Sequence, residues 1–272
     1  MADRMTLSIK HVTTYAFDAP VHYALQQLRL IPRNGHGQTV HEWTTTISGG
    51  TKQLTFDDHF VNHTELVMID AGATEVEVVS QGVVETEDQG GVIGAHAGFA
   101  PLWLFRDSTP MTAIGNNTRQ LAARVRDADG AEGDIPLLHA LSAEILKVVR
   151  YEAGRTDAGT TAEMALAAGH GVCQDHAHVM IAAARHLGFP ARYISGYLLM
   201  DDRTEQDASH AWCEVWTDAL GWLGFDVSNG ICPDARYVRV ATGRDYADAA
   251  PIHGIRQGDG AESLHVSLQV QQ

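Results

Sequence analysis

Cysteine, positive charge and long apolar runs are all scarce in this chain of 272 residues. Three cysteines, an odd number, argue against a disulfide framework and favour a reducing compartment. The first residues, M-A-D-R-M-T-L-S-I-K, lack the apolar region of a signal peptide, and no apolar run approaches the length of a membrane span. We therefore expect a cytoplasmic protein without a membrane partner.

Basic residues are outnumbered by acidic ones. The chain has 34 Asp and Glu against 19 Lys and Arg, which gives a formal net charge of −15. Nucleic acids and anionic membranes would repel such a chain, so neither is an expected partner. The acidic residues form small scattered groups, a pattern typical of solvated loops rather than of a cation site.

Three regions are distinguishable along the chain. Short alternating segments, separated by turn signals such as Asn34-Gly35 and Gly49-Gly50, predict an antiparallel β domain at 1–90. Glycine and alanine dominate the start of a linker at 91–115, which contains the apolar segment F-A-P-L-W-L-F. Helical patterns followed by further strands indicate a second domain at 116–272.

A buried helix is predicted to begin at Cys173 in G-V-C-Q-D-H-A-H and to end before Gly188 and Pro190. Its apolar residues recur at helical spacing: Ala177, Met180, Ile181, Ala184 and Leu187. Unpaired N–H groups and the helix dipole stabilise an anion in the first turn, so a thiol there is a good nucleophile. The Cys173 N–H is the expected first oxyanion donor, with Tyr151 or Gln174 as the second.

One charge opposes a thiolate at this position. Asp175 lies two residues after Cys173, and an unpaired carboxylate would disfavour a second anion nearby. We expect Arg192, at the start of the next strand, to neutralise Asp175.

Strand alternation indicates where a base and an orienting carboxylate would lie. In S-H-A-W-C-E-V-W, His210 shares a strand face with Trp212, and in the next strand Asp226 shares a face with Trp222. Antiparallel pairing would place His210 and Asp226 on the same side of the sheet. If the helix of Cys173 packs on that side, nucleophile, base and carboxylate converge.

Three segments in this order, G-V-C-Q-D-H-A-H, S-H-A-W-C-E-V-W and G-F-D-V-S-N-G, resemble the Cys, His and Asp motifs of the transglutaminase-like superfamily. Bacterial members with a β-rich N-terminal domain are the most similar. L-R-L-I-P-R-N near residue 30 and G-R-D-Y-A-D-A-A-P-I-H-G near residue 250 extend the resemblance over nearly the whole chain. His176 stands where an aromatic residue is expected, and Cys213 where valine is common.

The resemblance implies an α+β protein, with an N-terminal antiparallel β domain and a papain-like core whose Cys helix packs on an antiparallel sheet. Cys173 would be the nucleophile, His210 the base and later acid, and Asp226 the orienting group, with no metal or other cofactor. The partner would be a peptide or protein amide substrate, and an oligomer stays open. Besides Tyr151 and Gln174, Trp212 is a predicted substrate-site residue.

The resemblance leaves the reaction open, because the superfamily includes crosslinking transferases, peptidases and deglycosylating amidases, all acting through a thioester. A cytoplasmic bacterial-type chain favours hydrolysis over amine transfer. A non-catalytic binding module with this fold is an alternative of another class. The acidic loop M-D-D-R-T-E-Q-D-A before His210 would suit an amine or a basic peptide.

A zinc site is a further alternative, because C-x-x-H and H-x-x-C spacings both occur. The ligands would come from Cys173, His176, His178, His210 and Cys213. However, the predicted helix points His176 and His178 to different faces, and Cys213 faces away from His210. Both conflicts oppose the tetrahedral closure that zinc prefers.

Overall fold

The computed structural model describes residues 3–127, 132–257 and 260–272. In it the alternating N-terminal sequence, together with three later strands, forms two antiparallel sheets. Their strand orders are β11-β16-β1-β6-β3 and β15-β2-β5-β4. The strands are β1 (Arg4–Phe17), β2 (Tyr23–Ile31), β3 (Gln38–Ser48), β4 (Gly50–Asp57), β5 (His63–Ile69), β6 (Glu75–Glu87), β11 (Glu205–Gln206), β15 (Ile252–Gln257) and β16 (Glu262–Gln271).

The two sheets pack face to face as a sandwich because alternate residues of their strands are apolar. In β2, every second side chain from Ala24 to Leu30 is buried. The buried residues between the sheets include Tyr15, Phe17, Leu28, Leu30, Val67, Ile69, Val76 and Val78.

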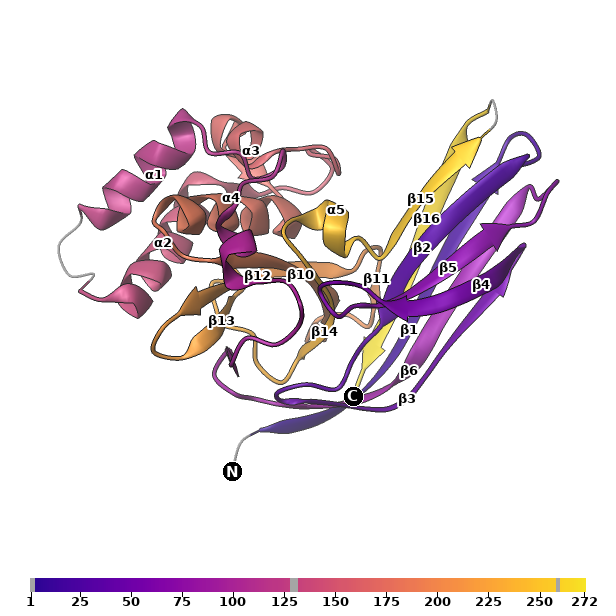
Figure 1. Cartoon of the computed structure of the whole chain (residues 1–272), viewed down its shortest axis with the longest axis horizontal. Helices are drawn as coiled ribbons and strands as arrows, with labels where there is room; N and C mark the ends of the chain where they lie inside the picture. Colours follow the sequence, from indigo (N-terminus) through magenta and orange to yellow (C-terminus); the bar gives the residue numbers. More distant parts are fainter. Residues whose placement is uncertain (1–2, 128–131, 258–259) are drawn as a thin grey trace.

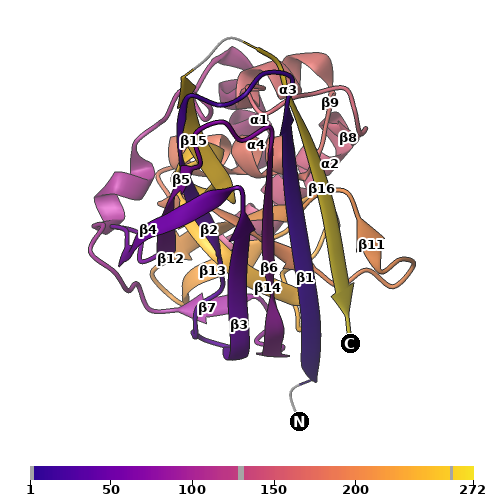
Figure 2. The same ribbon diagram turned by 90° about the vertical axis from the view of Figure 1, so that its right-hand side faces the viewer.

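The C-terminal strands return to this sandwich. β16 pairs with β1 from Ser8↔Gln271 to Phe17↔Glu262, and β15 pairs with β2. Figure 1 shows both strands in yellow beside the indigo N-terminal strands, and Figure 2 shows β1 between β6 and β16. Two strands of the predicted 116–272 domain, β15 and β16, thus belong to the sandwich. Sequence alternation identifies a strand but not the strand with which it pairs.

The third sheet has the order β14-β10-β12-β13-β7 and forms the other half of the molecule with the helices (Figure 1). Its edge strand β7 lies in the predicted linker. The strands are β7 (Val92–Gly94), β10 (Ala191–Leu198), β12 (His210–Thr217), β13 (Gly221–Phe225) and β14 (Tyr237–Gly243). The other elements are η1 (Leu102–Arg106), α1 (Asn116–Arg126), α2 (Asp134–Val148), β8 (Arg150–Tyr151), α3 (Ala162–Ala168), β9 (His170–Gly171), α4 (Cys173–His186) and α5 (Tyr246–Ala249).

Helix α4 is the central element of this half. From Asp175 to Arg185 every residue is buried. The helix packs on the sheet face that carries Ala211, Cys213 and Phe225, where small and apolar side chains allow close approach. The predicted α+β class, with a Cys-bearing helix on an antiparallel sheet, is confirmed. Within the described residues, no helix has the length and apolar character needed to cross a bilayer.

The two halves of the molecule are joined by a shared core and by polar contacts. Apolar residues from both halves pack together: Leu7, Ile9, Val84, Tyr197, Val238 and Val240. His11 Nδ1 lies 3.0 Å from the Tyr197 hydroxyl, and the Asn62 side chain bonds the Thr242 backbone at 2.7 and 2.8 Å. These contacts hold the sandwich against the third sheet.

Candidate active site

His210 and Asp226 form a short hydrogen bond at the start of β12 and the end of β13. His210 Nε2 donates to Asp226 Oδ2 at 2.6 Å, and both side chains are buried. The bond requires the two residues to share a sheet face, as the alternation predicts, and Cys213↔Phe225 pairing supplies that register. With Nε2 engaged, His210 Nδ1 is the nitrogen that remains to exchange a proton.

Two further side chains hold the Asp226 carboxylate. Oδ2 also accepts hydrogen bonds from Asn229 Nδ2 and the Tyr237 hydroxyl, each at 2.7 Å. Burial alone would raise the pKa of Asp226, but the hydrogen bonds from His210, Tyr237 and Asn229 lower it below its usual value. Asp226 is therefore an ionised carboxylate that orients His210.

Cys173 completes the group. Burial opposes protonation of His210, but its hydrogen bond to Asp226 and its interaction with the Cys173 thiol outweigh burial and raise the pKa of His210 to about 10. A raised pKa favours the protonated imidazole, which a thiolate–imidazolium pair requires. Trp212 stacks beside His210, with ring centroids 6.2 Å apart at an interplanar angle of 27°.

The three residues meet in a different way from the one that alternation suggested. Helix α4 packs on the Cys213 and Phe225 face, not on the face that His210 shares with Trp212. Cys173 is the first residue of α4 and His210 the first residue of β12, so they meet where both elements begin. The helix prefers the opposite face because it is small and apolar, whereas the His210 face carries charged and large aromatic groups.

The predicted pairing of Asp175 with Arg192 is wrong. Asp175 Oδ2 turns back over the start of α4 and accepts hydrogen bonds from Val172 N and Thr156 Oγ1, each at 2.8 Å. Arg192 instead pairs with Glu214, its neighbour across β10 and β12 on the far face of the sheet. Burial raises the pKa of Asp175, which reduces its opposition to a nearby anion.

The predicted oxyanion residues Tyr151 and Gln174 and the Cys173 N–H lie in different surroundings. Tyr151 is half exposed, and its ring lies 6.2 Å from the His176 ring, between centroids; burial and then the charge of Cys173 raise its pKa. The Gln174 side chain donates to Ala158 O at 3.3 Å, toward the preceding loop. The Cys173 N–H lies in the first turn of α4, where helical N–H groups have no partner within the helix. All these roles stay predictions.

A buried polar link that motif spacing did not identify holds the segment after Asp226. His176 Nε2 donates to Val149 O, and its Nδ1 accepts from the Ser228 hydroxyl, both at 2.8 Å. Burial lowers the pKa of His176, so the neutral ring keeps this arrangement. The signal in the sequence was the histidine at the position where an aromatic residue was expected, together with Ser228 and Asn229 in G-F-D-V-S-N-G.

The zinc alternative finds no converging ligand set. His178 is buried against α5, where its Nε2 accepts from Tyr246 N at 3.2 Å, and Cys213 lies in the core beside Phe225 O. Across the described parts of the chain, no three His, Cys, Asp or Glu side chains are grouped to hold a metal ion.

Loss of the Tyr237 hydroxyl should weaken the dyad without disturbing the fold. In Tyr237→Phe we expect alkylation of Cys173 by iodoacetamide at about pH 6 to slow by about 3- to 10-fold, because one charge-assisted hydrogen bond to Asp226 is lost. The pH of half-maximal alkylation should rise as well, which a purely structural change would not cause. Tyr197→Phe, which loses a hydrogen bond to His11 instead, is the matched control; equal slowing in both variants contradicts the assignment.

A thiol at a helix start, an imidazole and a buried carboxylate on an antiparallel sheet define the class of papain-like α+β proteins with a Cys-His-Asp group. The comparisons with known proteins then give the family. The model of the "Transglutaminase-like superfamily" matches residues 119–227, and that of the "Bacterial transglutaminase-like N-terminal region" matches residues 7–85. An uncharacterized protein of Mycobacterium leprae is 30% identical over 97% of this chain and 98% of its own length. The chain belongs to the transglutaminase-like superfamily.

Two further similarities agree with this family. An uncharacterized protein of Mycobacterium tuberculosis is 40% identical over 50% of this chain, and the match spans 47% of that longer protein. A crystal structure from Cytophaga hutchinsonii, described as a candidate cysteine protease, has a TM-score of 0.76 and 20% identity, and covers 100% of this chain and 93% of that one. The second similarity shows a shared fold over both halves of the molecule.

Proposed function

We propose that this protein is a cysteine-nucleophile amide hydrolase that acts through a thioester acyl-enzyme. The observation that carries the proposal is the position of His210, which bonds Asp226 at 2.6 Å and interacts with Cys173. Thiol-dependent acyl transfer needs a nucleophile, a proton carrier and an orienting carboxylate next to one another, and these two interactions of His210 support that assignment. No cofactor is required for this chemistry.

The proposed reaction has two halves. The Cys173 thiolate attacks the amide carbonyl, and the oxyanion that forms accepts a hydrogen bond from the Cys173 N–H. His210 Nδ1 gives its proton to the departing amine as the C–N bond breaks, which leaves a thioester. Water then attacks the thioester while His210 takes a proton from it, and the acid leaves as the thiolate and imidazolium are restored. Asp226 holds the ring throughout and keeps its charge.

Amine transfer is the second candidate, and the loop before β12 favours it. The loop carries Asp201, Asp202, Glu205 and Asp207 against one arginine of its own, Arg203, while Arg236 lies 3.7 Å from Asp201. The charge of Arg203 acts on Tyr151, a predicted oxyanion residue. A net negative loop at the mouth of the site would concentrate a primary amine or a basic peptide. An amine could then replace water in the second half-reaction, with His210 again taking the proton.

A single experiment distinguishes these outcomes. Casein is incubated with wild-type protein or Cys173→Ala, with and without methylamine, and the products are mapped by peptide mass. New chain ends indicate a peptidase, glutamine converted to glutamate an amidase, and methylamide groups a transferase. In parallel, acid-quenched enzyme is weighed intact for a Cys173 adduct that hydroxylamine releases. If none of these products depends on Cys173, the proposed function is wrong.

Removal of the loop's charge should change substrate preference. In the triple variant Asp201→Asn, Asp202→Asn and Asp207→Asn, we expect the ratio of kcat/KM for basic over acidic peptides to fall by about 3- to 10-fold, with weaker salt dependence, because attraction over the site is lost.

A matched control removes the same charge from the sandwich. Asp18→Asn, Glu75→Gln and Glu77→Gln change three exposed side chains on or beside the sandwich strands β1 and β6. In this control variant the ratio of kcat/KM for basic over acidic peptides should stay at the wild-type value. An unchanged ratio in the loop variant would exclude a role for the loop in selecting substrates.

A further inference from the structure

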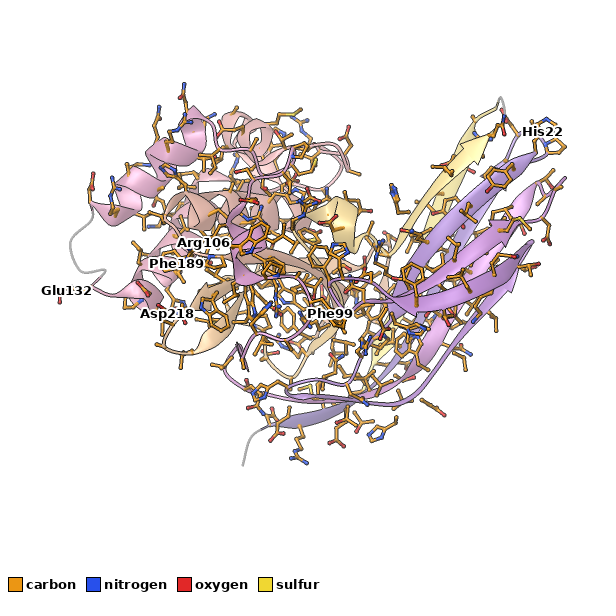
Figure 3. The ribbon with its side chains drawn as sticks, viewed as in Figure 1. His22, Phe99, Arg106, Glu132, Phe189 and Asp218 are labelled. Carbon is orange, nitrogen blue, oxygen red and sulfur yellow. The ribbon has the colours of Figure 1, made fainter. Side chains whose placement is uncertain are left out.

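A cavity of about 500 Å³ lies between the sandwich and the third sheet, and the residues that line it include neither Cys173 nor His210. Its floor is the sheet face opposite α4, with Trp212, Glu214 and Arg239, and its walls are the glycine-containing segments 33–38 and 89–98. Phe99, directly after the second wall segment, lies where the two halves of the molecule meet (Figure 3). Cavities of this size hold small organic ligands.

The cavity floor carries one more positive charge than negative charge. Glu214 is fully buried, and its carboxylate accepts from Arg192 Nε at 2.6 Å and from Arg239 Nε at 2.8 Å. Two guanidinium groups therefore share one carboxylate. Arg192 is itself buried over the Trp222 ring, whereas the Arg239 side chain keeps 33% of its surface exposed. Arg239 Nε and Nη2 donate to Glu214 and Thr242, so Nη1 of this partly exposed side chain is the donor available to a ligand.

The other charged residues of the cavity wall are paired, mostly with residues outside it. Arg33 pairs with Asp57 at 2.6 Å, and Asp234 pairs with Arg236 at 2.7 Å. The remaining wall carboxylate, Glu87, pairs with Arg4 at 3.3 Å. Arg4 also lies 3.7 Å from Glu85, and Arg236 lies 3.7 Å from Asp201, so these wall pairs add no positive charge and the surplus cation of the cavity is Arg239 on its floor.

Aromatic side chains line the same space. Phe60, Trp212 and Tyr237 contribute to its wall, and the Trp212 and Tyr237 rings meet edge to face with centroids 5.4 Å apart. Aromatic walls favour a planar apolar body, and a guanidinium favours a carboxylate. We propose that this cavity binds a small carboxylate with a planar apolar body, whose carboxylate pairs with Arg239.

The proposed site is separate from the active centre but shares a wall with it. Cys173 and His210 do not line the cavity. Trp212 lines it and stacks beside His210, while Tyr237 lines it and donates to Asp226. A ligand here therefore contacts the two side chains that support the His210–Asp226 dyad, from the side of the sheet away from α4.

Calorimetric titration with benzoate tests the proposal on the whole protein. We expect saturable binding to the wild type and binding at least about 10-fold weaker for benzamide, which has the same shape without the charge. Arg239→Gln should weaken benzoate binding by a similar factor, whereas Arg119→Gln, which removes an exposed arginine of α1 that does not line the cavity, should not. Circular dichroism confirms the fold of each variant, and the benzoate–benzamide comparison in the wild type stands if a variant does not fold.

Two further titrations test where the ligand binds and which kind of molecule supplies the carboxylate. Protein alkylated at Cys173 should still bind benzoate. This result would show that the ligand does not occupy the active centre, and the test holds whether or not the proposed activity is correct. N-acetylglutamate α-amide, which mimics an acidic protein side chain and lacks the planar body, is titrated as well; weaker binding than benzoate supports a free aryl acid, and tighter binding overturns the planar body. Equal binding of benzoate and benzamide, unchanged binding in Arg239→Gln, or loss of binding on alkylation overturns the proposal.

Discussion

Cys173 should react with iodoacetamide at about pH 6 about 10-fold faster than an ordinary thiol, and His210→Ala should remove this advantage. An unperturbed cysteine has a pKa of about 8.5, so only a small fraction is thiolate at that pH. A thiolate paired with an imidazolium is present in far larger amount, partly offset by its lower intrinsic nucleophilicity. The pKa of His210, raised to about 10, keeps the imidazolium in place through neutral pH.

The advantage of wild type over His210→Ala in alkylation rate should depend on pH. Because the folded-state pKa of His210 is raised, its charge is complete below its ordinary value of about 6.5 and is lost as pH rises toward about 10. The difference between wild type and His210→Ala should therefore be largest in mild acid and should narrow above about pH 9. Amide turnover, once a substrate is known, should fall by about 10⁴-fold or more in His210→Ala and in Cys173→Ala.

The other two cysteines serve as internal controls in the same peptide map. Burial raises the pKa of both Cys213 and Cys232, so neither should label at about pH 6. Slow labelling of Cys173 in the wild type, or fast labelling that persists in His210→Ala, would contradict the ion pair and with it the assignment of the nucleophile.

Glu214→Gln should destabilise the protein by about 3–5 kcal/mol. The carboxylate is fully buried between Arg192 and Arg239, and its loss leaves the Arg192 guanidinium buried without its partner. For a chain of this size the loss corresponds to a fall in Tm of about 5–9 °C, measurable by calorimetry. Arg239→Gln should cost far less, because that side chain is partly exposed and Arg192 still neutralises Glu214.

A double variant separates the unpaired charge from a general intolerance of this position. Arg192→Met with Glu214→Leu removes both buried charges, and it should recover much of the stability lost in Glu214→Gln. If the double variant is as unstable as the single one, packing rather than charge accounts for the loss.

Acid should weaken the same pair in the wild type. Burial raises the pKa of Glu214, but Arg192 and Arg239 outweigh this and lower it below its ordinary value of about 4.3. The ionised carboxylate therefore contributes stability above that pH, and the contribution is lost as pH falls through the lowered pKa. Wild type should lose stability steeply below about pH 4, and Glu214→Gln less steeply.

The sequence alone was enough to bring together His210 and Asp226. Alternation with a period of two places each side chain on a face, and a tight turn sets the register of the two strands that carry them. The helix starting at Cys173 was also predictable, because glycine, apolar spacing and the terminating Gly188 and Pro190 are all local signals. Family motifs in order then identified the superfamily.

The tertiary structure alone decided which layers cover these elements. Alternation says that His210 and Cys213 lie on opposite faces of β12, but not which face α4 covers; close packing of small side chains selects the Cys213 face. In the same way Arg192 pairs with Glu214 across the sheet rather than with Asp175, and β15 and β16 pair with β2 and β1. Local patterns depend on neighbours in the chain, whereas the choice of partner depends on surfaces that only the folded chain brings into contact, and the cavity at Arg239 arises at one such junction.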